Sequence, residues 1–179
     1  MNDNTYELRS MDLFTGLGGS LIAGSMLGWR PICLVEIEPF AQRILIQRMQ
    51  DGSLPPTPIW PDAGSFDAKP WAGSVDILVC GPPCQGFSVA GNGLGEADPR
   101  NQIPNVLRIL RDLECPRLYL ENSANLLSFD YFGQLLGQLG ELGFNARWST
   151  LSAAACGANH KRNRLWLYAW KKSMAHAIH

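Results

Sequence analysis

The stretch that most constrains the fold is an apolar run that ends in glycine, two prolines and a cysteine, Val75 to Cys84. Val75 to Val79 shows no polar alternation, which is typical of a parallel strand covered on both faces. The strand must stop at Pro82 and Pro83, because neither has the amide hydrogen that a continuing ladder needs. In open α/β sheets, ligands gather beyond the carboxyl ends of the strands. The stretch therefore predicts an α/β protein with Cys84 in a stiff loop at a ligand-binding edge.

The composition limits the number of domains, the kind of partner and the compartment. The 179 residues are 46% hydrophobic, which is enough for one well-covered core and too little for two generous ones. The formal net charge of −1 gives no general attraction to nucleic acid, so any phosphate-binding surface must be local. The five cysteines are odd in number and lack the short gaps of a zinc site, which predicts a reducing compartment and no bound metal. Without a signal peptide or a long apolar run, we expect a soluble cytoplasmic protein with no membrane partner.

A glycine-rich turn lies near the start of the chain. Leu8 to Phe14 predicts a strand, Thr15 to Ser20 a turn with three glycines, and Leu21 to Leu27 a helix. Glycines let a backbone approach a ligand, and the amino terminus of a helix offers free amide hydrogens. The full dinucleotide pattern is not met, so an ordinary tight turn is as good an interpretation as a cofactor loop.

Two acidic residues follow the next predicted strands. Glu36 comes at the end of a strand over Pro31 to Val35, where it could accept hydrogen bonds from ribose hydroxyls. The alternative is an acid that favours the dipole of the helix Pro39 to Gln50, and we assign that role to Glu38. Asp62, after a short strand near residues 59–60, is either a second cofactor contact or a simple turn former.

A second carboxylate and a basic segment follow Cys84. After a glycine-rich loop and a helix over residues 104–113, Arg117 to Leu120 predicts a strand that delivers Glu121 to the same sheet edge as Cys84. A capping or salt-bridged glutamate is the alternative. Beyond a helix over 131–142 and a strand over 145–151, Arg162 and Arg164 are spaced to share one side of an extended segment. A basic cluster is more often only a solvated face.

Several of these motifs resemble those of the C5-cytosine DNA methyltransferases. Gly81 to Gly91, Gly-Pro-Pro-Cys-Gln-Gly-Phe-Ser-Val-Ala-Gly, is similar to their catalytic loop, and Asp12 to Gly19 is similar to their S-adenosyl-L-methionine loop. The segment from His160 to Arg164 resembles a Gln-x-Arg-x-Arg motif, with histidine in place of glutamine. The tripeptide at Glu121 usually ends in valine, where this chain has serine. The resemblance covers about residues 11–170.

The resemblance implies roles for particular residues. It implies Cys84 as nucleophile, Glu121 as acid, Arg164 as the arginine that binds the flipped base, and Arg162 as support for the pocket. It also implies an S-adenosyl-L-methionine site, with S-adenosyl-L-homocysteine as product, formed by Asp12, Phe14, Gly16, Gly18, Gly19, Glu36, Ile37, Asp62, Ala63, Gly81 and Pro82.

The implied fold is a Rossmann-like, three-layer α/β sandwich with a mostly parallel, seven-stranded sheet that ends in an antiparallel hairpin near residues 145–169. The implied function is methyl transfer to carbon 5 of a flipped cytosine in duplex DNA, as in restriction-modification enzymes. Methylation of tRNA by the same chemistry and an inactive regulatory subunit are the alternatives. A nicotinamide-dependent oxidoreductase is weaker, since it has no use for the Pro-Cys turn or the arginines.

The chain departs from the family in one respect. Typical members continue past the last strand with a target-recognition region and a segment that returns to the cofactor site, whereas this sequence stops soon after Trp170. We therefore expect residues 1–179 to form a single catalytic domain without a separate recognition domain. It is either a minimal enzyme or the catalytic subunit of a split enzyme that needs a recognition partner. Its oligomeric state cannot be derived, and weak cofactor binding by the free chain is expected.

Overall fold

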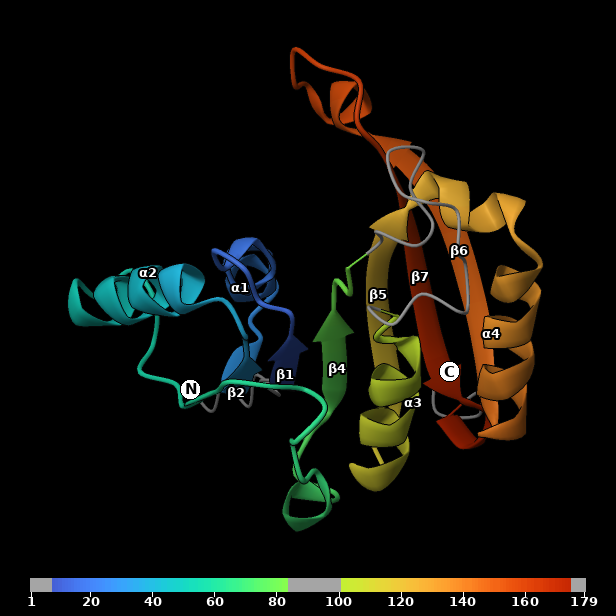
Figure 1. Ribbon diagram of the computed structural model, residues 1–179, viewed down its shortest axis with the longest axis horizontal. Coiled ribbons are helices and arrows are strands. Elements are labelled where there is room, and N and C mark those ends of the chain that lie inside the picture. Colours follow the sequence, from blue (N-terminus) through green and yellow to red (C-terminus); the bar gives the residue numbers. More distant parts are fainter. Residues whose placement is uncertain (1–7, 84–100, 175–179) are drawn as a thin grey trace, which may run out of the picture.

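The computed structural model describes residues 8–83 and 101–174, which form one seven-stranded sheet with helices on both faces (Figure 1). The strands are β1 (Arg9–Leu13), β2 (Arg30–Val35), β3 (Ile59–Trp60), β4 (Ile77–Cys80), β5 (Arg117–Ser123), β6 (Phe144–Ser152) and β7 (Asn163–Lys171). The α-helices are α1 (Gly19–Met26), α2 (Pro39–Gln50), α3 (Ile103–Asp112) and α4 (Asp130–Glu141). Short 3₁₀ turns are η1 (Lys69–Trp71), η3 (Ala124–Ser128), η4 (Ala153–Cys156) and η5 (Lys172–Met174). No helix in these residues is long and apolar enough to cross a membrane.

The sheet order is β3-β2-β1-β4-β5-β7-β6. Neighbours from β3 to β5 pair in parallel, whereas β7 runs antiparallel to both β5 and β6. The predicted mostly parallel sheet with a closing antiparallel hairpin is therefore confirmed. Because β7 runs against β5, its first residues lie at the carboxyl edge, where Arg164 is opposite Ser123.

Two apolar clusters lie on opposite faces of the sheet. The larger one joins α3 and α4 to the strands, and includes Ile109, Leu135, Leu120 and Leu167. The smaller one joins α1 and α2 to β2 through Leu21, Leu45 and Leu34, with Leu54. Residues Leu118, Leu120 and Asn122 of β5 are buried toward the larger cluster, so Tyr119 and Glu121 belong to the opposite face.

Some element ends differ from the sequence prediction. The strand predicted over residues 75–79 is Ile77–Cys80, and the strand predicted to end at Leu120 runs to Ser123. The second difference has a clear cause, since β7 supplies antiparallel partners for residues 121–123, and a parallel strand alone would leave their amides unpaired. Glu121 is therefore fixed within a strand.

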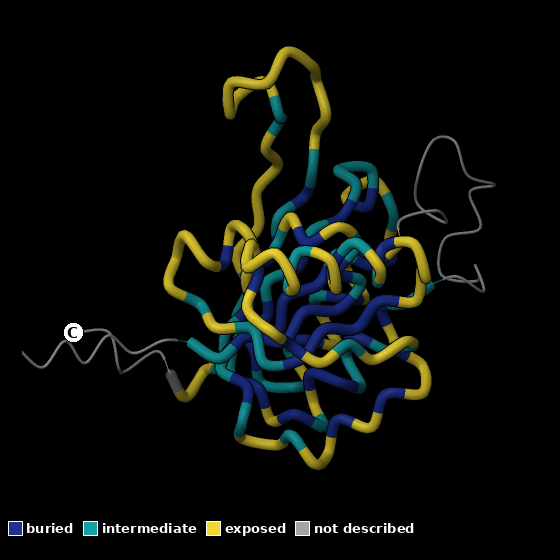
Figure 2. Tube along the Cα trace, turned by 90° about the vertical axis from the view of Figure 1, so that its left-hand side faces the viewer, coloured by how far each residue is buried: buried dark blue, intermediate teal, exposed yellow. Residues whose placement is uncertain are grey.

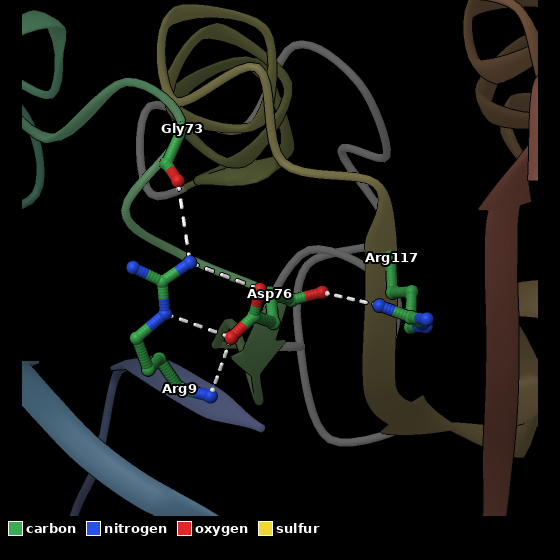
Figure 3. Close-up of polar contacts among 4 residues, drawn as sticks. All are labelled: Arg9, Gly73, Asp76 and Arg117. Atoms are coloured by element: carbon green, nitrogen blue, oxygen red, sulfur yellow. Dashed lines mark hydrogen bonds and ion pairs between the residues drawn. The ribbon is translucent and has the colours of Figure 1, made fainter. Parts of the chain in front are cut away.

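A cluster of charged side chains joins three strands at their amino-terminal ends, opposite the carboxyl edge (Figure 3). Asp76 accepts hydrogen bonds from the backbone amide of Arg9 at 2.8 Å and from its side chain, with 2.9 Å to Nε. Arg9 also donates to the carbonyl oxygen of Gly73, and Arg117 donates to that of Asp76. The cluster connects β1, the residues before β4, and β5.

We expect Asp76→Asn to lower the midpoint of thermal unfolding at pH 7 by about 2–4 °C. The hydrogen bonds from Arg9 lower the pKa of Asp76 below its ordinary value. A lowered pKa in the folded state contributes stability that is present above the unfolded value near ~3.9 and lost as pH falls through the folded value. Melting curves of the two proteins should therefore converge below about pH 4. A difference in melting midpoint that stays the same from pH 7 to below about pH 4 would rule out an ionic contribution of Asp76.

Candidate active site

A cavity of about 680 Å³ lies on the face of the sheet that carries α1. Ligand pockets in proteins commonly fall in the range of about 300–1,000 Å³. Its walls come from the end of β1 and the turn after it, from α1, and from β4, β5 and β7. The lining residues are Asp12, Phe14, Thr15, Gly19, Ser20, Ala23, Leu27, Trp29, Val79, Cys80, Gly81, Tyr119, Glu121, Arg162, Trp166 and Tyr168.

The glycine turn is shaped by a buried carboxylate. Glu36 is 6% exposed, and its Oε2 accepts a hydrogen bond from the amide of Gly16 at 2.6 Å. Its Oε1 accepts from the amide of Glu38 at 2.8 Å. Gly18 has φ of +86°, and a Cβ there would lie 3.1 Å from Leu45 Cδ2, so this position requires glycine. One carboxylate thus fixes both the turn after β1 and the chain after β2.

Phe14 is held in an uncommon backbone conformation. Its φ of +58° is one that a bulky side chain rarely adopts. Its amide donates to the carbonyl oxygen of Val35 at 2.8 Å, which fastens the conformation to β2. Strain of this kind tends to occur at functional sites, and Phe14 lines the cavity.

Asp12 is a buried acid in the cavity wall. It is 3% exposed, and burial raises its pKa to about 7, with a smaller contribution from the charge of Glu36. Hydrogen bonds from Ser20 and Thr15 act in the opposite direction and lower the pKa. Asp12 therefore titrates near neutral pH inside the cavity.

We expect Asp12→Asn to be more stable than the parent chain above pH 7. Because the pKa of Asp12 is higher in the folded state, the folded state binds the proton more tightly, and stability falls as pH rises from about 4 to about 7. Each unit of pKa difference corresponds to about 1.4 kcal/mol, so the variant should gain a few kcal/mol at pH 8. Urea unfolding at pH 4.5 and 8 checks this expectation. If both proteins lose the same free energy of unfolding between pH 4.5 and pH 8, Asp12 is not the cause of the pH dependence.

Glu121 and Arg164 form an ion pair at the carboxyl edge of the sheet. Arg164 Nε lies 2.6 Å from Glu121 Oε1, and the side chains are 25% and 30% exposed. The other oxygen, Oε2, lies over Gly81, where a Cβ would be 3.4 Å away. The carboxylate is thus held from one side by β7 and reaches the turn after β4 on the other.

The residues that lead toward Cys84 are hydrogen-bonded to β5, the strand that carries Glu121. Pro82 is buried, and its carbonyl oxygen accepts a hydrogen bond from Asn122 Nδ2 at 3.3 Å. Asn122 is 3% exposed and directly follows Glu121. The start of the predicted catalytic loop is thus fixed beside the predicted acid. Cys84 itself lies outside the described residues, as does the rest of the predicted catalytic loop up to Gly91.

Cys80 also lines the cavity but is unsuited to act as a nucleophile. It is 3% exposed, and burial raises the pKa of its thiol well above the ordinary value. The charges of Asp12 and Glu121 raise the pKa further. Since the thiolate is the reactive form, Cys80 is a structural thiol.

Apart from Asp62, the predicted site residues that the structure describes fall into three groups. Asp12, Phe14, Gly19, Gly81, Glu121 and Arg162 line the cavity. Gly16, Gly18, Glu36 and Pro82 support its wall through the contacts above, and Arg164 holds Glu121. Ile37 is 62% exposed and Ala63 is 4% exposed, and neither lines the cavity.

Asp62 behaves as a turn former. Its Oδ1 accepts from the amide of Gly64 at 2.9 Å, and its Oδ2 accepts from the amide of Ser65 at 3.2 Å. This is the turn role that the sequence left open as the alternative. A contact between Asp62 and a cofactor stays a prediction.

Sequence reasoning missed an aromatic wall. Tyr119 stacks on Trp166 with ring centroids 5.6 Å apart, and Tyr168 stacks on Trp170 at the same distance. The period-2 alternation of β7, with Leu165 and Leu167 buried, could have revealed this wall. No period-2 pattern marked Trp29, because this residue lies in the loop before β2 and not in a strand.

Two solved structures described as methyltransferases share this fold. A DNMT2 mutant from Spodoptera frugiperda matches with a TM-score of 0.74 at 22% identity, covering 94% of this chain and 51% of that chain. A putative DNA modification methyltransferase encoded within an Escherichia coli prophage matches with a TM-score of 0.73 at 24% identity, covering 94% and 48%. Identity this low shows the fold alone. These matches confirm the predicted Rossmann-like methyltransferase fold.

Comparison of sequences identifies the family. The type II methyltransferase M.CviJI of Paramecium bursaria Chlorella virus IL3A is 30% identical over 93% of this chain and 44% of its own length. M.NgoMIV of Neisseria gonorrhoeae is 30% identical over 92% of this chain and 52% of its own length. The chain thus spans about half the length of these curated relatives. The family model described as C-5 cytosine-specific DNA methylase matches residues 8–178. Because that match covers nearly the whole chain, the protein belongs to the C-5 cytosine-specific DNA methylase family.

Proposed function

We propose that the chain is a DNA (cytosine-5)-methyltransferase in which Glu121 assists the attack of Cys84 on a flipped cytosine. The observation that carries this proposal is the position of the Glu121 carboxylate. It is paired with Arg164 and lies over Gly81, so it sits beside the segment that leads to Cys84. The type II methyltransferases to which the chain is similar support duplex DNA as the substrate.

The chemistry explains why these residue types are needed. Carbon 5 of cytosine is a poor nucleophile within an aromatic ring. Addition of the Cys84 sulfur to carbon 6 breaks that aromaticity and moves electron density to carbon 5. Glu121 assists by giving a proton or hydrogen bond to ring nitrogen 3, and Arg164 stabilises the charge that develops on the ring. Carbon 5, now electron-rich, takes up the methyl group, and removal of the carbon 5 proton by a base then expels the Cys84 sulfur and restores the aromatic ring.

The residues of the cavity wall fit S-adenosyl-L-methionine. When bound, it supplies a methyl group on a positively charged sulfur and leaves as S-adenosyl-L-homocysteine. Glu36 uses each oxygen for one amide hydrogen, so each oxygen has room for a ribose hydroxyl. Asp12 can offer a negative charge inside the cavity, and Phe14 and Trp29 offer aromatic surface. The glycine turn allows close approach of the backbone.

Recognition of the DNA requires more than this core. A base inside a stacked duplex must be turned out to reach the Glu121 carboxylate at the cavity, and the vacated space and the flanking bases must be contacted. We propose that these contacts come from a recognition subunit or from further chain, because the relatives are about twice as long over their whole length. The described residues do not include a separate unit for this purpose.

Transfer of labelled methyl from S-adenosyl-L-methionine to mixed-sequence duplex DNA tests the proposal, with tRNA as competing substrate and Cys84→Ser as control. The proposal expects label at carbon 5 of cytosine in DNA, absent with the variant. Label in tRNA alone would favour the RNA alternative. A folded chain inactive on both, even with extracts of the source cells added, would favour the inactive subunit.

A further inference from the structure

Asp12 is a buried carboxylate in the floor of the cavity. Its neighbours in β1, Met11 and Leu13, belong to the larger apolar cluster, so the Asp12 side chain belongs to the opposite face of the sheet, which carries α1. Asp12 is opposite Val79 in β4, and Val79 is opposite Tyr119 in β5. All three line the cavity. At 3% exposed, Asp12 belongs to the buried interior that Figure 2 shows in dark blue.

The charge of Asp12 has no cationic partner in the part of the chain that the structure describes. The hydrogen-bond partners of its carboxylate are the hydroxyl groups of Ser20 and Thr15. The salt bridges among the described residues join Arg9 to Asp76, Arg111 to Asp112 and Arg164 to Glu121. A buried carboxylate without an opposite charge is costly. A positively charged ligand in the cavity would remove that cost.

The other ionisable groups around Asp12 do not supply a positive charge. The helix α1 carries no charged side chain. From the strands on either side come the acid Glu36, after β2, and the thiol of Cys80, in β4, with Glu121 beyond it on β5. Of the described residues, Arg162 also lines the cavity, but it forms no salt bridge with Asp12. The positive partner of Asp12 must therefore come from a ligand.

The sheet order places Asp12 between the two ends of the proposed cofactor site. In the order β2-β1-β4-β5, Glu36 follows β2 and Glu121 lies in β5 (Figure 1). In the proposed function, the ribose is held at Glu36 and the methyl group reaches a base at Glu121. The sulfur atom carries that methyl group and is one carbon from the ribose ring, so it must lie above β1 and β4. Neighbouring strands are only about 4.8 Å apart, which puts Asp12 beside the sulfur.

We propose that the Asp12 carboxylate pairs with the positively charged sulfur of S-adenosyl-L-methionine and so distinguishes the methyl donor from its product. This inference rests on the proposed function. When the methyl group is transferred, both electrons of its bond to sulfur stay on sulfur, which becomes neutral. The product therefore lacks the charge that Asp12 recognises, although it keeps the same adenine, ribose and amino acid groups. Asp12 thus favours exchange of the product for a new donor.

Titration calorimetry with the two ligands tests this inference on the full chain. S-Adenosyl-L-methionine and S-adenosyl-L-homocysteine are titrated separately at pH 8 into the parent chain, Asp12→Asn and the matched control Asp67→Asn. Asp67 is exposed and does not line the cavity, and both substitutions remove one carboxylate. Asp12→Asn should lower the affinity for the donor relative to that for the product by about tenfold or more, the equivalent of ~1 pKa unit. Asp67→Asn should keep the ratio of the parent.

The same titrations at pH 6 give a second readout. Burial raises the pKa of Asp12 to about 7, so its carboxylate is mostly ionised at pH 8 and mostly protonated at pH 6. A protonated acid does not attract a positive sulfur. The preference of the parent for the donor should therefore fall between pH 8 and pH 6, whereas Asp12→Asn should give the same ratio at both. Since this readout needs only the parent, it also decides the matter if the variant fails to fold.

Equal loss of both ligands in Asp12→Asn would overturn the inference, because Asp12 would then contact a group that donor and product share. An unchanged ratio in Asp12→Asn would also overturn it, as would an equal effect of Asp67→Asn. A ratio in the parent that is the same at pH 6 and pH 8, or no binding of the donor by the parent, would do so as well.

Methyl transfer to DNA is measured separately from ligand binding. Methyl transfer by the parent, together with an unchanged ligand preference in Asp12→Asn, would reject the role of Asp12 alone. A changed preference without any methyl transfer to DNA would reject the enzymatic proposal alone.

Discussion

Glu121→Gln is expected to lower the rate of methyl transfer by about 10²–10⁴-fold, the usual contribution of a general acid. Glutamine has nearly the same size but cannot release a proton to ring nitrogen 3. It also loses the charge that pairs with Arg164, whose Nε lies 2.6 Å from Glu121 Oε1. Single-turnover transfer with saturating DNA and cofactor measures the chemical step directly. The loss should appear in that rate and not in cofactor affinity.

Glu141→Gln is the matched control. Glu141 is an exposed glutamate at the end of α4, distant in sequence from the cavity wall and not among its lining residues. The control should retain the parent rate, and all three proteins should melt alike. A Glu121→Gln protein that transfers methyl within a few-fold of the parent would remove Glu121 from the catalytic step.

Glu36→Gln is expected to weaken binding of S-adenosyl-L-methionine by about 10–100-fold, on the basis of about 1.5–3 kcal/mol for one hydrogen bond to a charged group. Both oxygens of Glu36 accept backbone amides, from Gly16 at 2.6 Å and from Glu38 at 2.8 Å. The amide group of glutamine must place an N–H against one of these N–H donors. The turn after β1 would then lose its support. Titration calorimetry measures the affinity.

Glu38→Gln separates this effect from a general loss of acidic charge. Glu38 is two residues away, is exposed, and makes no side-chain cap at the start of α2. The Glu38→Gln protein should bind the cofactor with the affinity of the parent chain. If both variants lose affinity equally, the buried geometry of Glu36 is not what matters.

Individual strands were predictable because they are marked by short-range patterns, whereas the seven-stranded sheet and its closing hairpin were implied by the resemblance to the family. The unbroken apolar run at Ile77 to Cys80 and the prolines after it locate a buried central strand and its end. The alternation of Leu165, Leu167 and Ala169 marks β7 as half-buried. The end of β5 was misplaced, because its last residues pair with β7, a partner more than forty residues away in sequence.

The candidate site was predictable only in part. The sequence identified Glu121 and Arg164 separately, but their pairing depends on the register between β5 and β7. Trp29 and Tyr119 meet at the cavity only because α1 and β5 share one face of the sheet. The unusual titration of Asp12 arises from burial, which a local pattern does not report.

If Cys84 is the nucleophile, a covalent bond forms between Cys84 and cytosine, and trapping that bond is the most direct test. Duplex DNA with 5-fluorocytosine at target sites, incubated with S-adenosyl-L-methionine, cannot complete the reaction, because fluorine at carbon 5 cannot leave as a proton does. We expect a complex that survives denaturation, with the modified nucleotide on the peptide containing Cys84, and no complex with Cys84→Ser. An adduct on another residue, or labelled 5-methylcytosine formed by Cys84→Ser at the parent rate, would contradict it.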